Sequence, residues 1–128
     1  DLKKSNHKEQ NFIKILEKFD RIKYVWGGKS FKGIDCSALI QMYYLYNNKY
    51  FPRDTKDQIK FKKGIKNSTT FKKGNIIYWK GHVAICINSK KLIHAYGPMK
   101  RVIKMDIDYT IKRIFKTAKL KIKKITNI

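Results

Sequence analysis

The chain has 128 residues, enough for one domain around a single hydrophobic core and too few for two domains of ordinary size. Its longest apolar runs, Ile76 to Trp79 and Val83 to Ile87, are far shorter than the roughly 20 residues of a membrane-spanning helix, which excludes such a helix. Lys and Arg number 31 against 9 Asp and Glu, so the formal charge of +22 favours polyanionic partners over cationic ones. Because residue 1 is Asp rather than Met, we expect a processed protein or part of a longer one.

Three helices are expected in the first half of the chain. Apolar residues recur at helical spacing over residues 6–20, with Lys and Glu between them, which predicts an amphipathic helix. A glycine-containing loop over residues 23–33 separates it from a second, largely buried helix expected over residues 36–48. Pro52 then interrupts the chain, and a short third helix is expected over residues 54–61.

The second half of the chain changes to short segments rich in Ile, Val, Tyr and Trp, which predicts β-strands. The connections at Lys80-Gly81 and at residues 88–90 have hairpin length, and Gly97-Pro98 indicates a turn, so neighbouring strands should pair as an antiparallel meander. Helices first and strands second indicate an α+β fold, with the N-terminal helices packed on a C-terminal antiparallel sheet. The expected strands cover residues 75–79, 82–88, 91–96, 101–105 and 110–115.

The tail over residues 116–128 contains five lysines and no acidic residue. Apolar residues alternate with the lysines in part, so the tail is expected either to add an edge strand or to fray. No internal repeat is visible, and residues 1–128 are therefore expected to form one domain that ends in this basic tail.

Cys36 stands in the setting expected of a reactive thiol. Glycines at positions 27, 28 and 33 let the backbone pass close to a ligand, and the cysteine follows them at the predicted start of a helix. A thiol in the first helical turn faces unpaired amide N–H groups and the positive end of the helix dipole. Such surroundings, or a neighbouring imidazolium, lower a cysteine pKa from about 8.5 to roughly 3.5–7.5. The sequence therefore predicts a nucleophilic cysteine and hydrolase chemistry.

Three histidines are available as the base for such a nucleophile. His7 lies in the first predicted helix, where its side chain is expected to be solvated or to have its hydrogen bonds satisfied within the protein. His82 begins one predicted strand and His94 lies in the next, so the two can be cross-strand neighbours or near-neighbours. We assign His82 as general base toward Cys36 and His94 as the residue that fixes the tautomer of His82, although the two roles could be exchanged.

A metal site is not expected, because structural zinc favours closely spaced ligand pairs and the chain has no Cys-x-x-Cys or His-x-x-x-His. No cofactor is expected either. Cys86 lies within an apolar strand and is interpreted as a small core residue. A disulfide between Cys36 and Cys86 is not expected, because a nucleophile must stay free.

Six segments form a recognisable series along the chain: Tyr24-Val25-Trp26-Gly27-Gly28, residues 33–39, Phe51-Pro52-Arg53-Asp54 with Gln58, residues 73–79, residues 81–85 and Ile93-His94-Ala95. In this order they resemble the NlpC/P60 family of bacterial cell-wall cysteine peptidases, a papain-like group. The resemblance implies the papain-like NlpC/P60 fold and a catalytic triad of Cys36, His82 and His94. One departure is Gly74-Asn75, where the family usually has Gly-Asp.

The resemblance also implies substrate-binding roles for four residues. The residue that matches Tyr24 lies beside the thiol and is a candidate to stabilise the tetrahedral oxyanion together with backbone N–H groups. An acid matching Asp35 and a hydroxyl matching Ser37 are expected to receive the free amine of a terminal L-alanine. Arg53 lies in the family's Pro-Arg segment, where it either contacts substrate or forms an ion pair that ties the third helix to the core.

Members of the family cleave stem peptides of peptidoglycan, most often the bond between γ-D-glutamate and a diamino acid, and many have SH3-like domains before the catalytic one. The resemblance thus implies peptidoglycan peptides as partners and a location in the bacterial cell envelope, periplasmic or secreted, with cytoplasmic peptide recycling as the alternative. SH3-like domains would lie outside these residues. A high positive charge would favour adsorption to polyanionic cell wall, although a lysine-rich composition also arises from an A- and T-rich genome.

Two other functions remain open. The same triad could act as an amidase or acyltransferase on another substrate. Alternatively, the chain could be a non-catalytic basic module that binds envelope polymer or nucleic acid. Nucleic acid is not the expected partner, because the basic charge is diffuse and no helix-turn-helix or aromatic RNA-binding motif is present.

Overall fold

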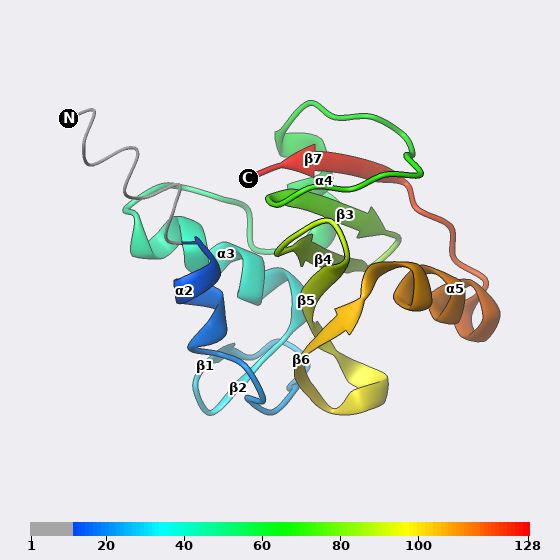
Figure 1. The fold of residues 1–128 in the computed structure, drawn as a ribbon. Coiled ribbons are helices and arrows are strands. Elements are labelled where there is room, and N and C mark those ends of the chain that lie inside the picture. The colour runs from blue at the N-terminus through cyan, green and yellow to red at the C-terminus, as the bar shows by residue number, and fades with distance from the viewer. Residues whose placement is uncertain (1–11) are drawn as a thin grey trace.

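The computed structural model describes residues 12–128, in which helices lie on both sides of an antiparallel sheet (Figure 1). Strands β1 and β2 form a separate two-stranded ribbon, and the other five form one sheet in the order β6-β5-β4-β3-β7. The helices are α2 (Phe12–Glu17), α3 (Cys36–Tyr46), α4 (Thr55–Phe61) and α5 (Ile107–Ala118), with a 3-10 turn η1 (Gly97–Met99). The strands are β1 (Lys29–Ser30), β2 (Gly33–Ile34), β3 (Asn75–Trp79), β4 (His82–Cys86), β5 (Lys91–Tyr96), β6 (Arg101–Asp106) and β7 (Lys124–Asn127).

The predicted α+β fold and the meander of β3, β4, β5 and β6 are confirmed. The β3–β4 hairpin turns through Lys80 and Gly81, where Gly81 has a φ of 74°, a conformation that glycine adopts without strain. The first predicted helix is present as α2, and the part of that prediction over residues 6–11, with His7, lies outside the described residues.

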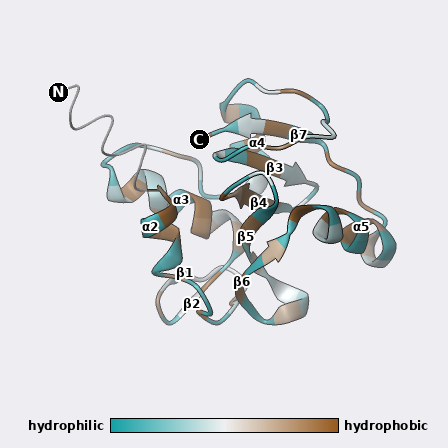
Figure 2. Ribbon diagram, in the orientation of Figure 1, coloured by the Kyte–Doolittle hydropathy of each residue, from teal (hydrophilic) through white to brown (hydrophobic). Residues whose placement is uncertain are grey.

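The core occupies both faces of the large sheet because its strands alternate two sets of apolar residues. Val83 and Ile85 of β4 belong to the cluster that also contains α2 and α3 residues, whereas Ala84 and Cys86 face the cluster that contains Ile107 and Ile114 of α5. Figure 2 shows the corresponding hydrophobic colouring of the central strands. A sheet covered on both faces explains why all five residues of β3 are buried.

The predicted strand over residues 110–115 is wrong, because these residues belong to helix α5. The buried side chains Ile107, Thr110 and Ile114 follow helical spacing, and the side chain of Asp106 caps the helix by accepting a hydrogen bond from the Tyr109 amide at 3.1 Å. The β-branched residues of this segment favour a strand, but packing of its apolar side chains against the sheet stabilises a helix. The tail after α5 adds the edge strand β7, which pairs with β3.

Candidate active site

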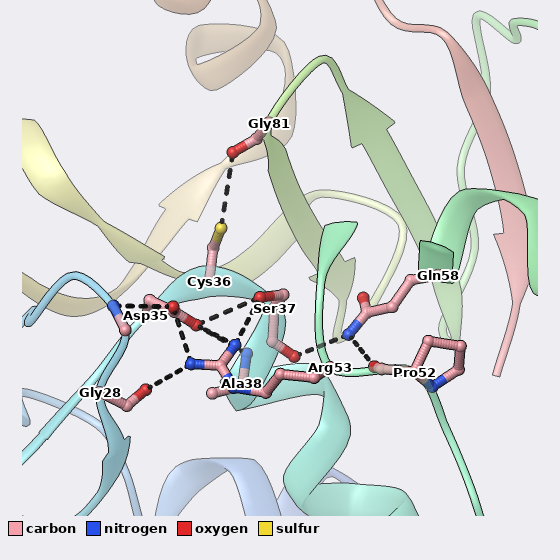
Figure 3. A network of polar contacts seen from close by, with 10 residues as sticks. Gly28, Asp35, Cys36, Ser37, Ala38, Pro52, Arg53, Gln58 and Gly81 are labelled. Atoms are coloured by element: carbon pink, nitrogen blue, oxygen red, sulfur yellow. Dashed lines mark hydrogen bonds and ion pairs between the residues drawn. The ribbon is translucent and has the colours of Figure 1, made fainter. Parts of the chain in front are cut away.

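The N-terminus of α3 holds Cys36 near the start of β4, the central strand of the large sheet. Asp35 is the N-cap of the helix, and its carboxylate accepts a hydrogen bond from the Ala38 amide at 2.9 Å. The Cys36 side chain is 6% exposed, and its sulfur lies 3.9 Å from the carbonyl oxygen of Gly81 (Figure 3). Gly81 directly precedes His82, so the thiol contacts the turn that leads into β4, the strand that begins with His82.

His82 and His94 lie in direct contact, with Nε2 of His82 2.8 Å from Nδ1 of His94. The register pairs Ile85 of β4 with Ile93 of β5, and alternation along both strands then places the histidines on one face of the sheet. Tyr96 stacks on the His94 ring, with centroids 4.6 Å apart. His94 is fully buried and His82 is half-buried. The predicted contact between the two imidazoles is therefore present.

The hydrogen bond of the thiol goes to the main chain rather than to an imidazole. Cys36 donates to the Gly81 carbonyl, while Nε2 of His82 is directed at His94. The only ring nitrogen of His82 not used in this contact is Nδ1. A proton from Cys36 can reach His82 only at Nδ1, and the thiol must first leave its hydrogen bond to the Gly81 carbonyl.

Burial sets the protonation states at this site. Desolvation raises the pKa of the Cys36 thiol, and the negative charge of Asp35 acts in the same direction; hydrogen bonds from the Val83 backbone and the Thr55 side chain lower it without reversing the shift. This result differs from the low pKa expected at a helix start, because burial outweighs the helix terminus. Burial also lowers the pKa of His82 to about 4. At neutral pH the site thus contains a thiol and a neutral imidazole.

The carboxylate of Asp35 is occupied by groups of the chain itself. Both Arg53 amino groups contact it at 3.0 Å, one on each oxygen, and the Gly27 amide and the Ser37 hydroxyl also donate to it. One amino group of Arg53 additionally donates to the Ser37 hydroxyl at 2.9 Å (Figure 3). The structure therefore contains the ion pair that was the alternative to a substrate contact for Arg53, and it leaves Asp35 with no unused acceptor position.

A pocket of about 420 Å³ opens beside the thiol. Trp26 lies on its rim and is 85% exposed, while Tyr24 lines the pocket with its phenol pKa raised to about 12 by burial and by the neighbouring Cys36 and Asp35. The phenol is therefore protonated at neutral pH and can donate a hydrogen bond. The pocket is lined by Tyr24, Trp26, Gly27, Asp35, Cys36, Ser37, Arg53, Asp54, Thr55, Lys56 and Gly81.

Gln58, Thr55 and Asp54 also belong to the site, although their sequence pattern predicted at most a helix cap at Asp54 or Thr55. Gln58 of α4 is fully buried and donates hydrogen bonds to the Ser37 and Pro52 carbonyls, both at 2.9 Å, which ties α4 to the start of α3. Thr55 contacts the thiol, and Asp54 lines the pocket as the N-cap of α4 without a side-chain cap hydrogen bond. The Arg53-Asp54 segment within the family-like motif was the available signal for these neighbours.

Within residues 12–128 no group of three or more His, Cys, Asp or Glu side chains is arranged to hold a metal ion. Over the same residues, no helix has both the length and the apolar content needed to cross a bilayer. Cys36 and Cys86 are both free thiols.

Comparisons with known proteins place the chain in a family. Dipeptidyl-peptidase 6 of Lysinibacillus sphaericus is 35% identical over 88 residues, which cover 67% of this chain and 32% of that protein. Gamma-D-glutamyl-L-lysine dipeptidyl-peptidase of Bacillus subtilis is 30% identical over 96 residues, covering 69% and 32% of the two chains. The chain thus spans about a third of the length of these curated relatives.

Solved structures with a similar fold include two peptidoglycan hydrolases. The NlpC/p60 domain of peptidoglycan hydrolase SagA has a TM-score of 0.74 at 24% identity, with 94% of this chain and 98% of that one covered. RipB from Mycobacterium tuberculosis has a TM-score of 0.76 at 19% identity, with 96% and 65% covered. The NlpC/P60 family model itself matches residues 21–119. The chain belongs to the NlpC/P60 family.

Proposed function

We propose that this domain is a cysteine peptidase that hydrolyses peptidoglycan stem peptides at the bond between γ-D-glutamate and a diamino acid. Cys36 is the nucleophile, His82 the general base and His94 the residue that orients His82. The observation that supports this most directly is the 2.8 Å contact between the imidazoles of His82 on β4 and His94 on β5, with His82 directly after the Gly81 carbonyl that the Cys36 thiol contacts. The names of the curated relatives, both dipeptidyl-peptidases, support the substrate class.

The proposed reaction begins from a protonated Cys36 thiol and a neutral His82 imidazole. The thiol turns toward Nδ1 of His82 and transfers its proton there as sulfur attacks the substrate carbonyl carbon. The neutral Tyr24 phenol, at the edge of the same pocket, donates a hydrogen bond to the oxyanion that forms. The imidazolium then gives its proton to the leaving amine, and water hydrolyses the thioester with His82 again acting as base.

We assign recognition of a free substrate amine to Asp54 rather than to Asp35 and Ser37. The carboxylate of Asp35 is already held by Arg53, Ser37 and backbone amides. Asp54 is exposed, lines the pocket and makes no side-chain hydrogen bond at its helix cap, so its carboxylate is available to an ammonium group.

The test is mass spectrometry of fragments released from a defined stem peptide, L-Ala-γ-D-Glu-L-Lys, and from its N-acetylated form. Wild type should release L-Ala-γ-D-Glu from the free peptide, and Cys36→Ala should release none. Cys86→Ala is the matched control, since Cys86 is a buried thiol in the α5-side core. If Asp54 receives the amine, acetylation and Asp54→Asn should each raise KM at least tenfold.

Other outcomes identify the alternatives. An amidase or acyltransferase would give the corresponding amide-cleavage or acyl-exchange product from a different substrate and leave this peptide intact. A non-catalytic module would release nothing, and Cys36→Ala would then match wild type in every assay. We further propose that residues 1–128 form a single catalytic domain acting in the cell envelope, with any SH3-like domain outside them.

A further inference from the structure

A third side chain continues the contact between the two histidines. Met105 lies on β6, and its Sδ is 3.1 Å from Nε2 of His94. The β5–β6 register pairs His94 with Ile103, which makes Met105 its diagonal neighbour on the same face. His82, His94 and Met105 thus form a row of contacts across three adjacent strands.

The sulfur of Met105 defines which nitrogen of His94 bears the proton. A thioether has no hydrogen to donate, so it can only accept. An attractive contact therefore requires an N–H group at Nε2 of His94. Burial and the neighbouring His82 hold the pKa of His94 well below its usual range, so the ring is neutral and has one proton. With that proton on Nε2, Nδ1 of His94 has a lone pair.

The tautomer of His94 in turn determines the tautomer of His82. Nδ1 of His94 and Nε2 of His82 are 2.8 Å apart, and a hydrogen bond there needs one proton between them. Since Nδ1 of His94 is the acceptor, Nε2 of His82 must be the donor. The second nitrogen of a neutral His82, Nδ1, is then unprotonated. If the proton of His94 were on Nδ1 instead, the lone pair of its Nε2 would face the lone pairs of the Met105 sulfur. The His94 side chain is fully buried, so no water would compensate for that contact.

We propose that Met105 is a positioning residue that sets the direction of the hydrogen bonds along this row and so keeps Nδ1 of His82 unprotonated and ready to accept the proton of Cys36. The benefit for catalysis rests on the proposed function. The tautomers themselves are a property of the resting protein and can be measured without substrate.

The test begins with imidazole ¹⁵N spectra of the intact chain at pH 7. Only three histidines are present, and His7→Gln removes one set of signals. His94 is identified by its proximity to the Met105 methyl group. Both His82 and His94 should show a protonated Nε2 and an unprotonated Nδ1. A protonated Nδ1 on either ring in wild type overturns the proposal.

The variant is Met105→Leu, which removes the acceptor and nearly conserves volume. Its matched control is Met42→Leu, because Met42 is equally buried, at 8% exposure, but belongs to the core cluster on the side of α2 and α3. In Met105→Leu we expect signals of both tautomers for His94 and His82, and a kcat about three- to tenfold lower with KM unchanged, as for loss of one hydrogen bond. Met42→Leu should keep the wild-type tautomers and kcat.

Wild-type tautomers in Met105→Leu, or an equal loss of kcat in both variants, would overturn the role of Met105. If the spectra behave as expected while no stem peptide is cleaved by wild type, the proposed peptidase function fails and the tautomer assignment stands.

Discussion

At the scale of single residues, Asp35 and Arg53 have a structural role, because their polar atoms bind each other and other groups of the protein. Two separate contacts at 3.0 Å fix the guanidinium to the carboxylate, and the same carboxylate caps α3. The helix start that presents Cys36 is therefore braced by an ion pair from the segment before α4.

We predict that Arg53→Met lowers the free energy of unfolding by about 2 kcal/mol, because it leaves a mostly buried carboxylate without its cation. The control is Lys104→Met, which removes the cation from an exposed pair with Glu17 and should cost less than about 1 kcal/mol. Urea denaturation of both variants measures the difference. Equal losses of unfolding free energy in Arg53→Met and Lys104→Met would show that burial does not strengthen the Arg53–Asp35 ion pair.

A second prediction at this scale concerns pH. Burial lowers the pKa of His82 from 6.5 to about 4, so between these values the unfolded chain binds a proton that the folded chain does not. This contribution to stability is therefore complete above pH 6.5 and is lost as the pH falls toward 4. The His94 pKa, also lowered by burial, acts in the same direction.

Urea denaturation at pH 7 and pH 4.5 tests this dependence. The loss of stability between the two should be smaller in His82→Gln than in wild type, since carboxylate titration is common to both proteins. The same loss in both would mean that His82 titrates normally.

At the scale of elements, β7 shows how a basic tail becomes part of the fold. Ile65 and Ile125 exchange backbone hydrogen bonds of 2.8 and 3.0 Å, so the loop before β3 holds the last strand in place. Gly64 allows this approach, because a Cβ there would lie 2.1 Å from the Ile125 carbonyl oxygen.

We predict that Gly64→Ala destabilises the protein by about 1–3 kcal/mol, because strand β7 or the loop must move to make room. Gly97→Ala is the control, since its Cβ would make an ordinary contact at 3.7 Å with the Tyr24 ring. Thermal unfolding and hydrogen exchange of the β7 amides measure the effect. Unchanged protection of β7 in Gly64→Ala would contradict it.

At the scale of the whole molecule, the charge of +22 is distributed over the chain rather than concentrated at the pocket. The pocket itself contains acids, Asp35 and Asp54, as well as the bases Arg53 and Lys56. If the proposed function holds, we expect the general charge to act at long range on a polyanionic surface and the pocket to bind the short peptide.

We predict that hydrolysis of intact cell-wall sacculi falls severalfold between 50 and 500 mM NaCl, because salt screens the attraction between the chain and the wall. Cleavage of the short peptide L-Ala-γ-D-Glu-L-Lys should change much less. Release of soluble fragments from the two substrates gives the comparison. Equal sensitivity, or none with either substrate, would exclude a role of the charge in adsorption.

Local patterns in the sequence were enough to predict α3, α4 and the four-strand meander, because apolar periodicity and turn residues act over a few neighbouring positions. They failed for residues 110–115, whose β-branched side chains suit a strand but pack on the sheet as helix α5. The spacing of His82 and His94 was likewise sufficient to predict their contact, since two strands joined by a short turn leave few possible registers.

By itself the sequence determined which residues could form the site: a cysteine at a helix start, two histidines on neighbouring strands and an acid with an arginine near the cysteine. Only the tertiary structure decided that the thiol faces the Gly81 carbonyl, that Arg53 occupies Asp35, and that Met105 lies against His94. It also decided the direction of the pKa shifts, because desolvation depends on everything packed around a group. These contacts join residues 11, 18 and 45 positions apart, and each depends on side-chain directions that packing fixes and spacing alone does not.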